Sequence, residues 1–79
     1  MYYVYILQSQ KDKTYYIGIT KNLKKRIKKH NLGKIKYTSR RKPYKLLFYC
    51  VFLNKEKAYK FEKYLKTGSG NAFFKKRFV

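Results

Sequence analysis

The chain passes from strand to helix within one short segment, Tyr15-Tyr16-Ile17-Gly18-Ile19-Thr20 followed by Lys21-Asn22-Leu23-Lys24-Lys25-Arg26-Ile27-Lys28-Lys29-His30. Its first part is rich in aromatic and β-branched residues, which favours a β-strand. Asn22 is of a type that caps helix N-termini, and Gly33 can end a helix that runs to about residue 31. We therefore predict a strand over residues 14–19 and a basic helix directly after it.

The predicted helix is amphipathic. At about 100° per residue, Leu23, Ile27 and His30 fall on one stripe, and Arg26 borders it. The only arginine and the only histidine of this helix therefore lie at the boundary of the core. The opposite arc carries four lysines: Lys24, Lys25, Lys28 and Lys29.

A second strand is predicted upstream, over residues 2–7, and the polar residues 8–13 form a turn that makes a hairpin with residues 14–19. Because side chains alternate between the two faces of a strand, Tyr3 and Tyr5 share one face, and Tyr16 and Gly18 share one face. Gly18 would leave room beside Tyr16 for a ligand or another part of the backbone.

The second half of the chain is predicted to add a strand and two helices. The apolar run over residues 46–53 suggests a central strand covered on both faces. Asn54 can cap a helix that ends near Gly68, and Ser69 can cap a short last helix. The core stripe of the first of these helices would be Ala58, Phe61 and Leu65, and the last helix would contain Phe73, Phe74 and Phe78.

The predicted order of elements is β-β-α-β-α-α, which indicates an α+β fold with a small sheet and helices packed against it. A length of 79 residues fits one domain, so we take residues 1–79 as a single unit. It has room for one core and one site.

Charge is the strongest signal in the composition. Lys and Arg total 22 against three acidic residues, a formal net charge of +19. This charge indicates a polyanionic partner, and nucleic acid fits better than an anionic membrane surface. The alternative is that the charge only keeps the protein soluble, but it exceeds what solubility needs by at least about twofold. Candidate nucleic-acid-binding residues are the helix lysines Lys24, Lys25, Lys28 and Lys29 and the connector residues Arg40, Arg41 and Lys42.

The sequence favours a cytosolic location. Cys50 is the only cysteine, so no intramolecular disulfide forms, and a reduced thiol suits the cytosol. The N-terminus lacks the pattern of a signal peptide. The apolar run over residues 46–53 is far too short to cross a bilayer.

Several kinds of catalytic site are excluded by residue counts. There is no Cys/His cluster of zinc-ligand spacing and no phosphate-binding glycine loop of the GxxxxGK type. One histidine without a Ser or Cys partner makes acyl transfer a poor hypothesis. With Asp12, Glu56 and Glu62 as the only acids, a metal site of two or three carboxylates is excluded on count.

Glu62 and Arg26 each allow a structural and a functional interpretation. Glu62 could pair with Lys66 at i+4, or it could be the single carboxylate that holds Mg²⁺, whose other ligands would be waters and substrate phosphate. Arg26 could pair with Glu62 or coat the surface, or its guanidinium could bind phosphate oxygens and stabilise charge in a transition state.

The tyrosines and His30 are also open to two interpretations. A tyrosine acts as a general base only if its pKa falls from about 10, and a dense positive field would lower it. His30 could end its helix as a cation favoured by the dipole, or it could relay a proton or bind a phosphate.

Two short segments, Tyr3-Val4-Tyr5 and Tyr16-Ile17-Gly18, resemble the two half-motifs of the GIY-YIG nucleases, with Tyr3 where glycine is commonest. The segment over residues 22–26 looks like the helix that carries the family arginine. Further segments resemble the small single-domain branch of the family: His30-Asn31-Leu32-Gly33, Tyr37-Thr38, Pro43 and residues 58–62. The resemblance spans residues 2–66 and extends to the N-terminal catalytic domain of the repair excinucleases.

The resemblance implies a three-stranded, mostly antiparallel sheet flanked by three helices, and metal-dependent hydrolysis of one phosphodiester bond. It makes Tyr5 a base or hydrogen-bonding partner and gives Tyr16 the same role or that of orienting the attacking water. Arg26 would stabilise transition-state charge, and His30 would assist near the nucleophile. Glu62 would bind one Mg²⁺ or Mn²⁺ ion. Asn71 is a candidate for a further polar residue that many members carry.

The sequence thus predicts an endonuclease acting on nucleic acid, DNA before RNA, in repair or recombination. The alternative is a non-catalytic DNA- or RNA-binding module on the same scaffold, because aromatic residues interleaved with basic ones suit stacking on single strands. A homodimer and a larger repair complex are both compatible with this interpretation, and a membrane partner is not expected.

Overall fold

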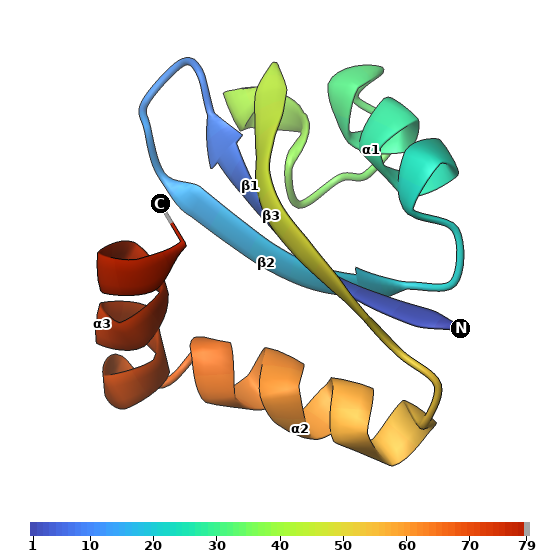
Figure 1. Cartoon of the computed structure of the whole chain (residues 1–79). Helices are drawn as coiled ribbons and strands as arrows, with labels where there is room; N and C mark the ends of the chain where they lie inside the picture. The colour runs from blue at the N-terminus through green and yellow to red at the C-terminus, as the bar shows by residue number, and fades with distance from the viewer. Residues whose placement is uncertain (79) are drawn as a thin grey trace.

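A computed structural model of the chain describes residues 1–78. Within them, β1 (Tyr2–Ser9), β2 (Tyr15–Thr20) and β3 (Tyr44–Phe52) form an antiparallel sheet in the order β2-β1-β3. The helices are α1 (Leu23–Asn31), α2 (Lys55–Leu65) and α3 (Gly68–Arg77), with a 3₁₀ turn over Ser39–Arg41 (Figure 1). The predicted α+β fold and the order β-β-α-β-α-α are confirmed.

The central strand is β1, and because both of its edges are paired and both of its faces are covered, Val4, Tyr5, Ile6 and Leu7 are all at most 1% exposed. The prediction that the apolar run over residues 46–53 forms the central strand is therefore wrong. That run belongs to β3, which lies at an edge of the sheet and starts two residues earlier. Its solvent-facing positions are filled by apolar residues, so an unbroken apolar run does not distinguish an edge strand from a covered one.

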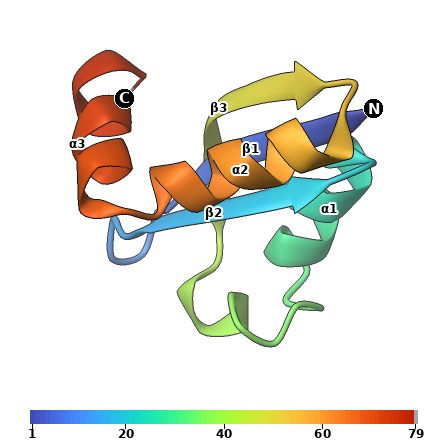
Figure 2. The same cartoon turned by 90° about the horizontal axis from the view of Figure 1, so that it is seen from below.

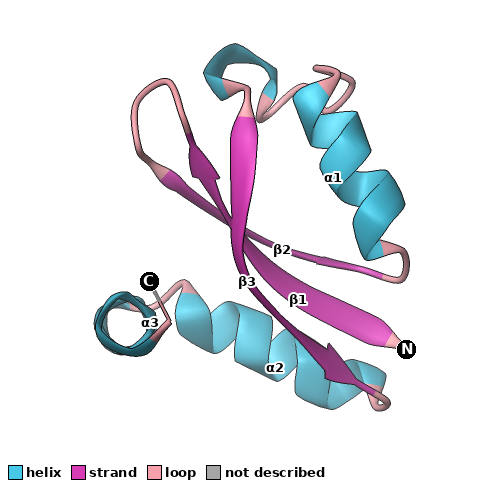
Figure 3. Ribbon diagram, turned by 45° about the horizontal axis from the view of Figure 1, so that its top comes forward, coloured by secondary structure: helices cyan, strands magenta, loops and turns pink. Residues whose placement is uncertain are grey.

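Helices cover both faces of the sheet. The face toward α1 packs Tyr5, Leu7 and Tyr44 against Leu23 and Ile27. The opposite face packs β-strand residues against α2 and α3, which lie together on that side (Figure 3). The buried residues of this second cluster are Val4, Ile6, Ile17, Ala58, Leu65 and Phe74. The predicted stripe of α2 is confirmed, with Phe61 partly buried beside it.

Both predicted asparagine caps are confirmed. The Oδ1 of Asn22 accepts a hydrogen bond from the backbone N–H of Lys25 at 3.1 Å. The Oδ1 of Asn54 accepts one from the N–H of Lys57 at 3.0 Å. Beyond α1, Gly33 has a φ of 73°, a left-handed conformation that favours glycine and ends the helix as expected.

The junction between α2 and α3 differs from the prediction. Gly68 is the first residue of α3 rather than the stop of α2, and Thr67, not Ser69, is the cap. The Thr67 hydroxyl accepts the N–H of Gly70 at 3.1 Å, because the chain turns into α3 directly after α2 ends. A Cβ on Gly70 would lie 2.8 Å from the Leu65 Cα, so glycine lets the two helices approach closely.

Aromatic side chains fix α3 to the sheet. Phe74 is fully buried, and the ring of Phe78 stacks on Phe48 of β3 at 4.0 Å between centroids. Cys50, on the same strand, is a partly buried free thiol. None of the helices in residues 1–78 combines the length and apolar character needed to span a bilayer.

Candidate active site along the open edge of β2

β2 is an edge strand that lies between α1 and α2 (Figure 2). Its residue Gly18 stands directly opposite Tyr5 of β1. A Cβ at Gly18 would lie 2.5 Å from the Tyr5 hydroxyl oxygen and 2.6 Å from its Cζ. The space that the glycine was expected to leave is therefore occupied by the Tyr5 phenol.

The Tyr5 hydroxyl is held by a buried chain of hydrogen bonds. It lies 3.0 Å from the Nε2 of His30, whose Nδ1 lies 2.7 Å from the Thr38 hydroxyl. The Thr38 hydroxyl donates to the carbonyl of Ile35 at 3.4 Å, which leaves its oxygen to accept from His30. One tautomer satisfies every group: His30 donates from Nδ1 to Thr38, and Tyr5 donates to Nε2.

His30 is completely buried, and burial followed by the nearby Arg26 charge lowers its pKa to about 4. The ring is therefore neutral near pH 7. The interpretation of His30 as a cation at the end of its helix, or as a phosphate-binding group, is wrong for this reason. What the geometry supports is a residue that orients Tyr5.

The Tyr5 hydroxyl does not lose its proton readily. Burial raises its pKa above its ordinary value, and the neighbouring Tyr16 raises it further. Arg26 lowers the pKa and Glu62 raises it, but burial is the largest effect. The expectation that the positive field would lower a tyrosine pKa is therefore wrong for Tyr5. Burial destabilises the phenolate by more than the nearby positive charge stabilises it. Tyr5 is placed to make hydrogen bonds.

Tyr16 continues the cluster toward the surface. Its ring centroid lies 5.0 Å from that of His30, 6.3 Å from Tyr5 and 5.9 Å from Tyr37. Tyr16 is half-buried, in contrast to the enclosed Tyr5. Tyr16 thus connects the enclosed Tyr5 with the exposed Tyr37 and can itself be reached by solvent.

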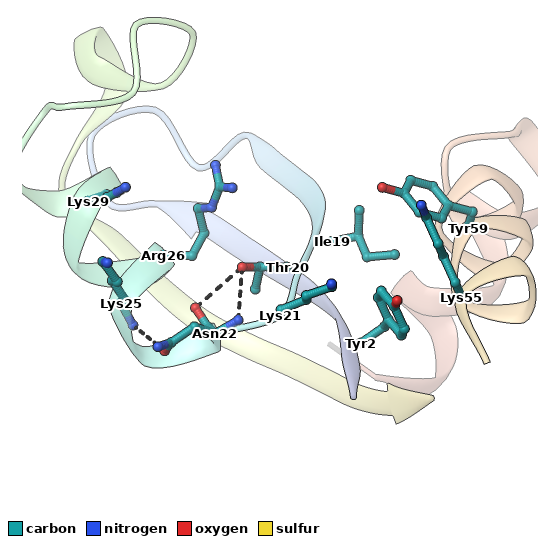
Figure 4. Close-up of a pocket in the computed structure, with 10 residues that line it drawn as sticks. All are labelled: Tyr2, Ile19, Thr20, Lys21, Asn22, Lys25, Arg26, Lys29, Lys55 and Tyr59. Atoms are coloured by element: carbon teal, nitrogen blue, oxygen red, sulfur yellow. Dashed lines mark hydrogen bonds between the residues drawn. The ribbon is translucent and has the colours of Figure 1, made fainter. Parts of the chain in front are cut away.

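A hollow of about 420 Å³ opens where β2 ends, and we call it the α1–α2 hollow. Lys25, Arg26 and Lys29 of α1 line one side of it, while Lys55 and Tyr59 of α2 line the other (Figure 4). Thr20 and Asn22 form the floor between the helices. The two helices pack on opposite faces of the sheet, so the hollow between them extends across the open edge of β2.

Glu62 lies farther along α2, three residues after Tyr59 and four before Lys66, so these three share one side of the helix. Arg26 lies on α1 and Glu62 on α2, and these helices pack on opposite faces of the sheet. Arg26 forms no ion pair with a side-chain carboxylate of residues 1–78, so the structure does not support its pairing with Glu62.

The carboxylate of Glu62 pairs with Lys66 at 2.9 Å, and its side chain is 16% exposed. Both interpretations of Glu62 thus have a physical basis, because Lys66 is half exposed and can turn away into solvent. In the described part of the chain, no group of three or more His, Cys, Asp or Glu residues could hold a metal ion. Glu62 is not among the residues that line the α1–α2 hollow, and its lone carboxylate fits Mg²⁺ or Mn²⁺ only if substrate phosphate and waters complete the coordination.

The predicted basic residues do not all share one surface. Lys25 and Lys29 line the α1–α2 hollow, whereas Lys24 lies beside a different groove at Tyr3 and Tyr49. Arg41 pairs through Nε with Asp12 at 3.0 Å. The remaining predicted phosphate-binding residues are solvent-exposed: Lys28, Arg40 and Lys42.

A second hollow, of about 530 Å³, opens at the beginning of β2, and we call it the Tyr37 hollow. It is lined by Tyr16 and Tyr37 together with Arg41, Lys66 and Asn71. Lys66 links it to the Glu62 carboxylate, so the two hollows lie on either side of Glu62 along α2.

Sequence reasoning brought Tyr5, Tyr16, Gly18, Arg26 and His30 into one region, and the structure places them together. It did not identify Thr38 as the partner of His30, nor Tyr37, Lys66 and Tyr59 as lining residues. Thr38 follows His30 by eight residues in an irregular connector, where no periodicity indicates which side chain turns inward. An aromatic residue inside a basic connector was the one available signal for Tyr37.

Comparison with known proteins gives a consistent result. The family model described as the GIY-YIG catalytic domain matches residues 1–77. UPF0213 protein CPE1444 of Clostridium perfringens is 51% identical over 72 residues, covering 90% of this chain and 76% of that protein. UPF0213 protein SpyM50708 of Streptococcus pyogenes is 47% identical over 76 residues, covering 95% and 72%. The solution NMR structure of UPF0213 protein BH0048 from Bacillus halodurans has a TM-score of 0.58 and 37% identity, covering 94% of this chain and 82% of that one.

Proposed function

The chain belongs to the GIY-YIG nuclease family, and from that premise we propose that it is a metal-dependent endonuclease that hydrolyses one phosphodiester bond in nucleic acid, most readily DNA. The observation that carries the proposal is the convergence at the open edge of β2. There Arg26 lines the α1–α2 hollow and Tyr16 lines the Tyr37 hollow, while Tyr5 and His30 form a buried hydrogen-bonded pair against Tyr16. Glu62 lies on α2 between Tyr59 of the first hollow and Lys66 of the second. We propose that all 79 residues act as one catalytic domain in the cytosol.

Arg26 is proposed to bind the scissile phosphate. It lines the α1–α2 hollow beside Lys25 and Lys29, so a phosphate there meets three cations. The planar guanidinium donates two parallel hydrogen bonds to phosphate oxygens and stabilises the charge that grows on them in the transition state. Lysine supplies only a point charge, which explains the use of arginine at this position.

Tyr16 is proposed to orient the attacking water. Its half-buried ring faces the Tyr37 hollow, and its packing against His30 fixes the ring position. Tyr5 lies deeper in the protein than Tyr16. Its hydroxyl donates to Nε2 of His30, and the hydroxyl oxygen lies beside Gly18 of β2. Because burial disfavours protonation of His30, its proposed contribution is to position the Tyr5 hydroxyl.

Glu62 is proposed to hold one Mg²⁺ or Mn²⁺ ion, in keeping with the general divalent-metal dependence of the family. A bound ion would neutralise phosphate charge and polarise the phosphoryl group. Lys66 competes for the same carboxylate, and its release toward an incoming phosphate would free Glu62. Repair or recombination is the proposed setting, because lysines and arginines that contact phosphates hold nucleic acid without reading its sequence.

The test compares two variants with matched controls from the same helices. Arg26→Ala and Glu62→Ala should each lower nicking of supercoiled plasmid and branched DNA by about 100-fold or more in Mg²⁺ or Mn²⁺. The controls are Lys28→Ala, which removes an exposed cation of α1 that lines neither hollow at the edge of β2, and Glu56→Ala, which removes the other acid of α2. Both controls should cleave within about twofold of the wild type, and EDTA should stop every reaction.

Binding measured by fluorescence anisotropy in EDTA separates this proposal from a non-catalytic binding module. The endonuclease hypothesis requires divalent-dependent nicking that is lost in Arg26→Ala and Glu62→Ala while affinity changes little. Tight binding by the wild type with no nicking on any substrate would instead support the module. Equal cleavage by the wild type and both variants would end the catalytic assignment.

A further inference from the structure

The Tyr37 hollow contains an aromatic ring that packing does not explain. Tyr37 is 77% exposed, although it sits in a connector between two ordered elements. Its ring meets only one other aromatic ring of residues 1–78, that of Tyr16, at 5.9 Å and with planes inclined by 49°. A large aromatic surface left in water next to a candidate active site is a feature of ligand-binding surfaces.

The mouth of the hollow is cationic. The side chains of Arg41 and Lys66 are each 53% exposed although each pairs with an acid. Arg41 uses its Nε for Asp12, which leaves its terminal nitrogens to donate elsewhere. Lys66 retains donors beyond the one that Glu62 accepts. The hollow thus combines an exposed ring with cations that can reach a phosphate.

This chemistry fits one nucleotide rather than a protein or a duplex. A second copy of this chain would carry another charge of +19 into the same place, so self-association there is disfavoured. Within a duplex, away from its ends, each base face is covered by its neighbours, so there only an unpaired base can stack on an aromatic side chain. The volume of about 530 Å³ lies in the range of pockets that hold small ligands.

We propose that the Tyr37 hollow binds an unpaired nucleotide next to the scissile phosphate, with its base stacked on Tyr37 and its phosphate held by Lys66 and Arg41. This inference rests on the proposed function for the meaning of the scissile phosphate. The preferred substrates are therefore nucleic acids with a single-stranded segment beside the cut, such as overhangs, flaps and junctions with unpaired arms. Blunt duplex binds through the lysines alone.

The chain contains no tryptophan, so Tyr37→Trp introduces a unique fluorophore at the proposed stacking position. In EDTA, a duplex with a single-stranded DNA overhang should quench this fluorescence strongly on saturation. A blunt duplex with the same number of phosphates should leave it largely unchanged. The matched control is Tyr49→Trp, which replaces a tyrosine that is 50% exposed on the opposite edge strand β3, and no substrate should quench it selectively.

A second variant measures the effect on affinity. Tyr37→Leu should reduce the affinity for the overhang duplex by about 5- to 100-fold and leave blunt-duplex affinity unchanged, because stacking is lost and the cations remain. Equal quenching of Tyr37→Trp by blunt and overhang duplexes, or no quenching at saturation, would overturn the inference. Selective quenching without any cleavage in Mg²⁺ would retain the nucleotide site and refute the nuclease activity, so the two proposals fail separately.

Discussion

His30 is the residue whose chemistry is changed most by the fold. Sequence position at the end of a helix suggests a cationic side chain, since the helix dipole favours positive charge there. The structure instead buries the ring between Tyr5 and Thr38, where each nitrogen has one partner. Burial dominates, so the ring stays neutral and its role is to hold Tyr5.

The lowered pKa of His30 predicts how stability depends on pH. Between about pH 4 and its ordinary pKa near 6.5, the unfolded chain binds a proton that the folded chain does not. The free energy of unfolding should therefore be highest above about pH 6.5. It should fall by up to about 3 kcal/mol as the pH drops toward 4. Urea denaturation at several pH values measures this dependence.

The control for this prediction is His30→Gln, which cannot take up that proton and should have a nearly constant stability from about pH 7 to about pH 4.5. Few other groups titrate in this pH range, because the chain has only one histidine and three acidic side chains. A wild-type protein that is equally stable at the two ends of this range would contradict the assignment of His30 as a buried neutral ring.

The residues that sequence analysis placed correctly are those whose position follows from period and spacing. Arg26 and His30 lie one turn apart on α1, and the alternation of side chains puts Tyr16 and Gly18 on one face of β2. The register that sets Gly18 opposite Tyr5 was not predicted. The protonation of Tyr5 and His30 was not predictable either. The sign of the Tyr5 pKa shift depends on the competition between burial and the field of Arg26, and only the packing shows that burial is the larger effect.

At the scale of elements, the close approach of β1 and β2 depends on Gly18. An alanine there would place its Cβ 2.5 Å from the buried Tyr5 hydroxyl. We expect Gly18→Ala to displace the phenol, lengthen the Tyr5–His30 hydrogen bond and lower stability by about 1 to 3 kcal/mol. Cleavage should fall more than unfolding explains, which parallel urea titrations and nicking assays would detect.

Gly68→Ala is the matched control, because nothing in residues 1–78 lies within 4 Å of a Cβ at this position. It should be neutral or stabilise the protein by up to about 1 kcal/mol, since alanine restricts the unfolded chain. If both glycine variants had the same stability and cleavage, the close approach of Gly18 to Tyr5 would not be needed for either.

The ends of helices were predictable where a capping residue marks them in the sequence. The order of the strands and the packing of helices were not, because only tertiary contacts determine them. Asn22 and Asn54 were identified as caps because each precedes a periodic apolar stripe. The order of the strands has no such signal, and the apolar solvent face of β3 made it resemble a covered strand. The choice of Thr67 over Ser69 as a cap depends on how closely Gly70 lets α3 approach α2.

At the scale of the whole molecule, a charge of +19 makes the affinity for nucleic acid strongly salt-dependent. We expect affinity for a duplex of about 20 bp to fall by about 1,000-fold or more between about 50 and 200 mM salt, because bound phosphates release counterions. Lys25→Gln combined with Lys29→Gln should lower the slope of log affinity against log salt by roughly 2. Anisotropy titrations at several salt concentrations give this slope.

The matched control removes two exposed lysines on the outer side of α2, Lys60→Gln with Lys63→Gln. These line neither hollow at the edge of β2, so the slope should change by less than half as much. An equal change in both double variants would mean that phosphates bind over the whole surface without preference for the α1–α2 hollow.

The open edge of β2 has a consequence for how the protein behaves in concentrated solution. An unpaired strand edge is a template on which a strand from another molecule can add, and repeated addition leads to fibrils. Here the flanking lysines repel a second copy, so electrostatic repulsion guards the backbone groups that the sheet leaves unpaired. A polyanion that neutralises those lysines without filling the edge would remove this protection and favour aggregation of the purified protein.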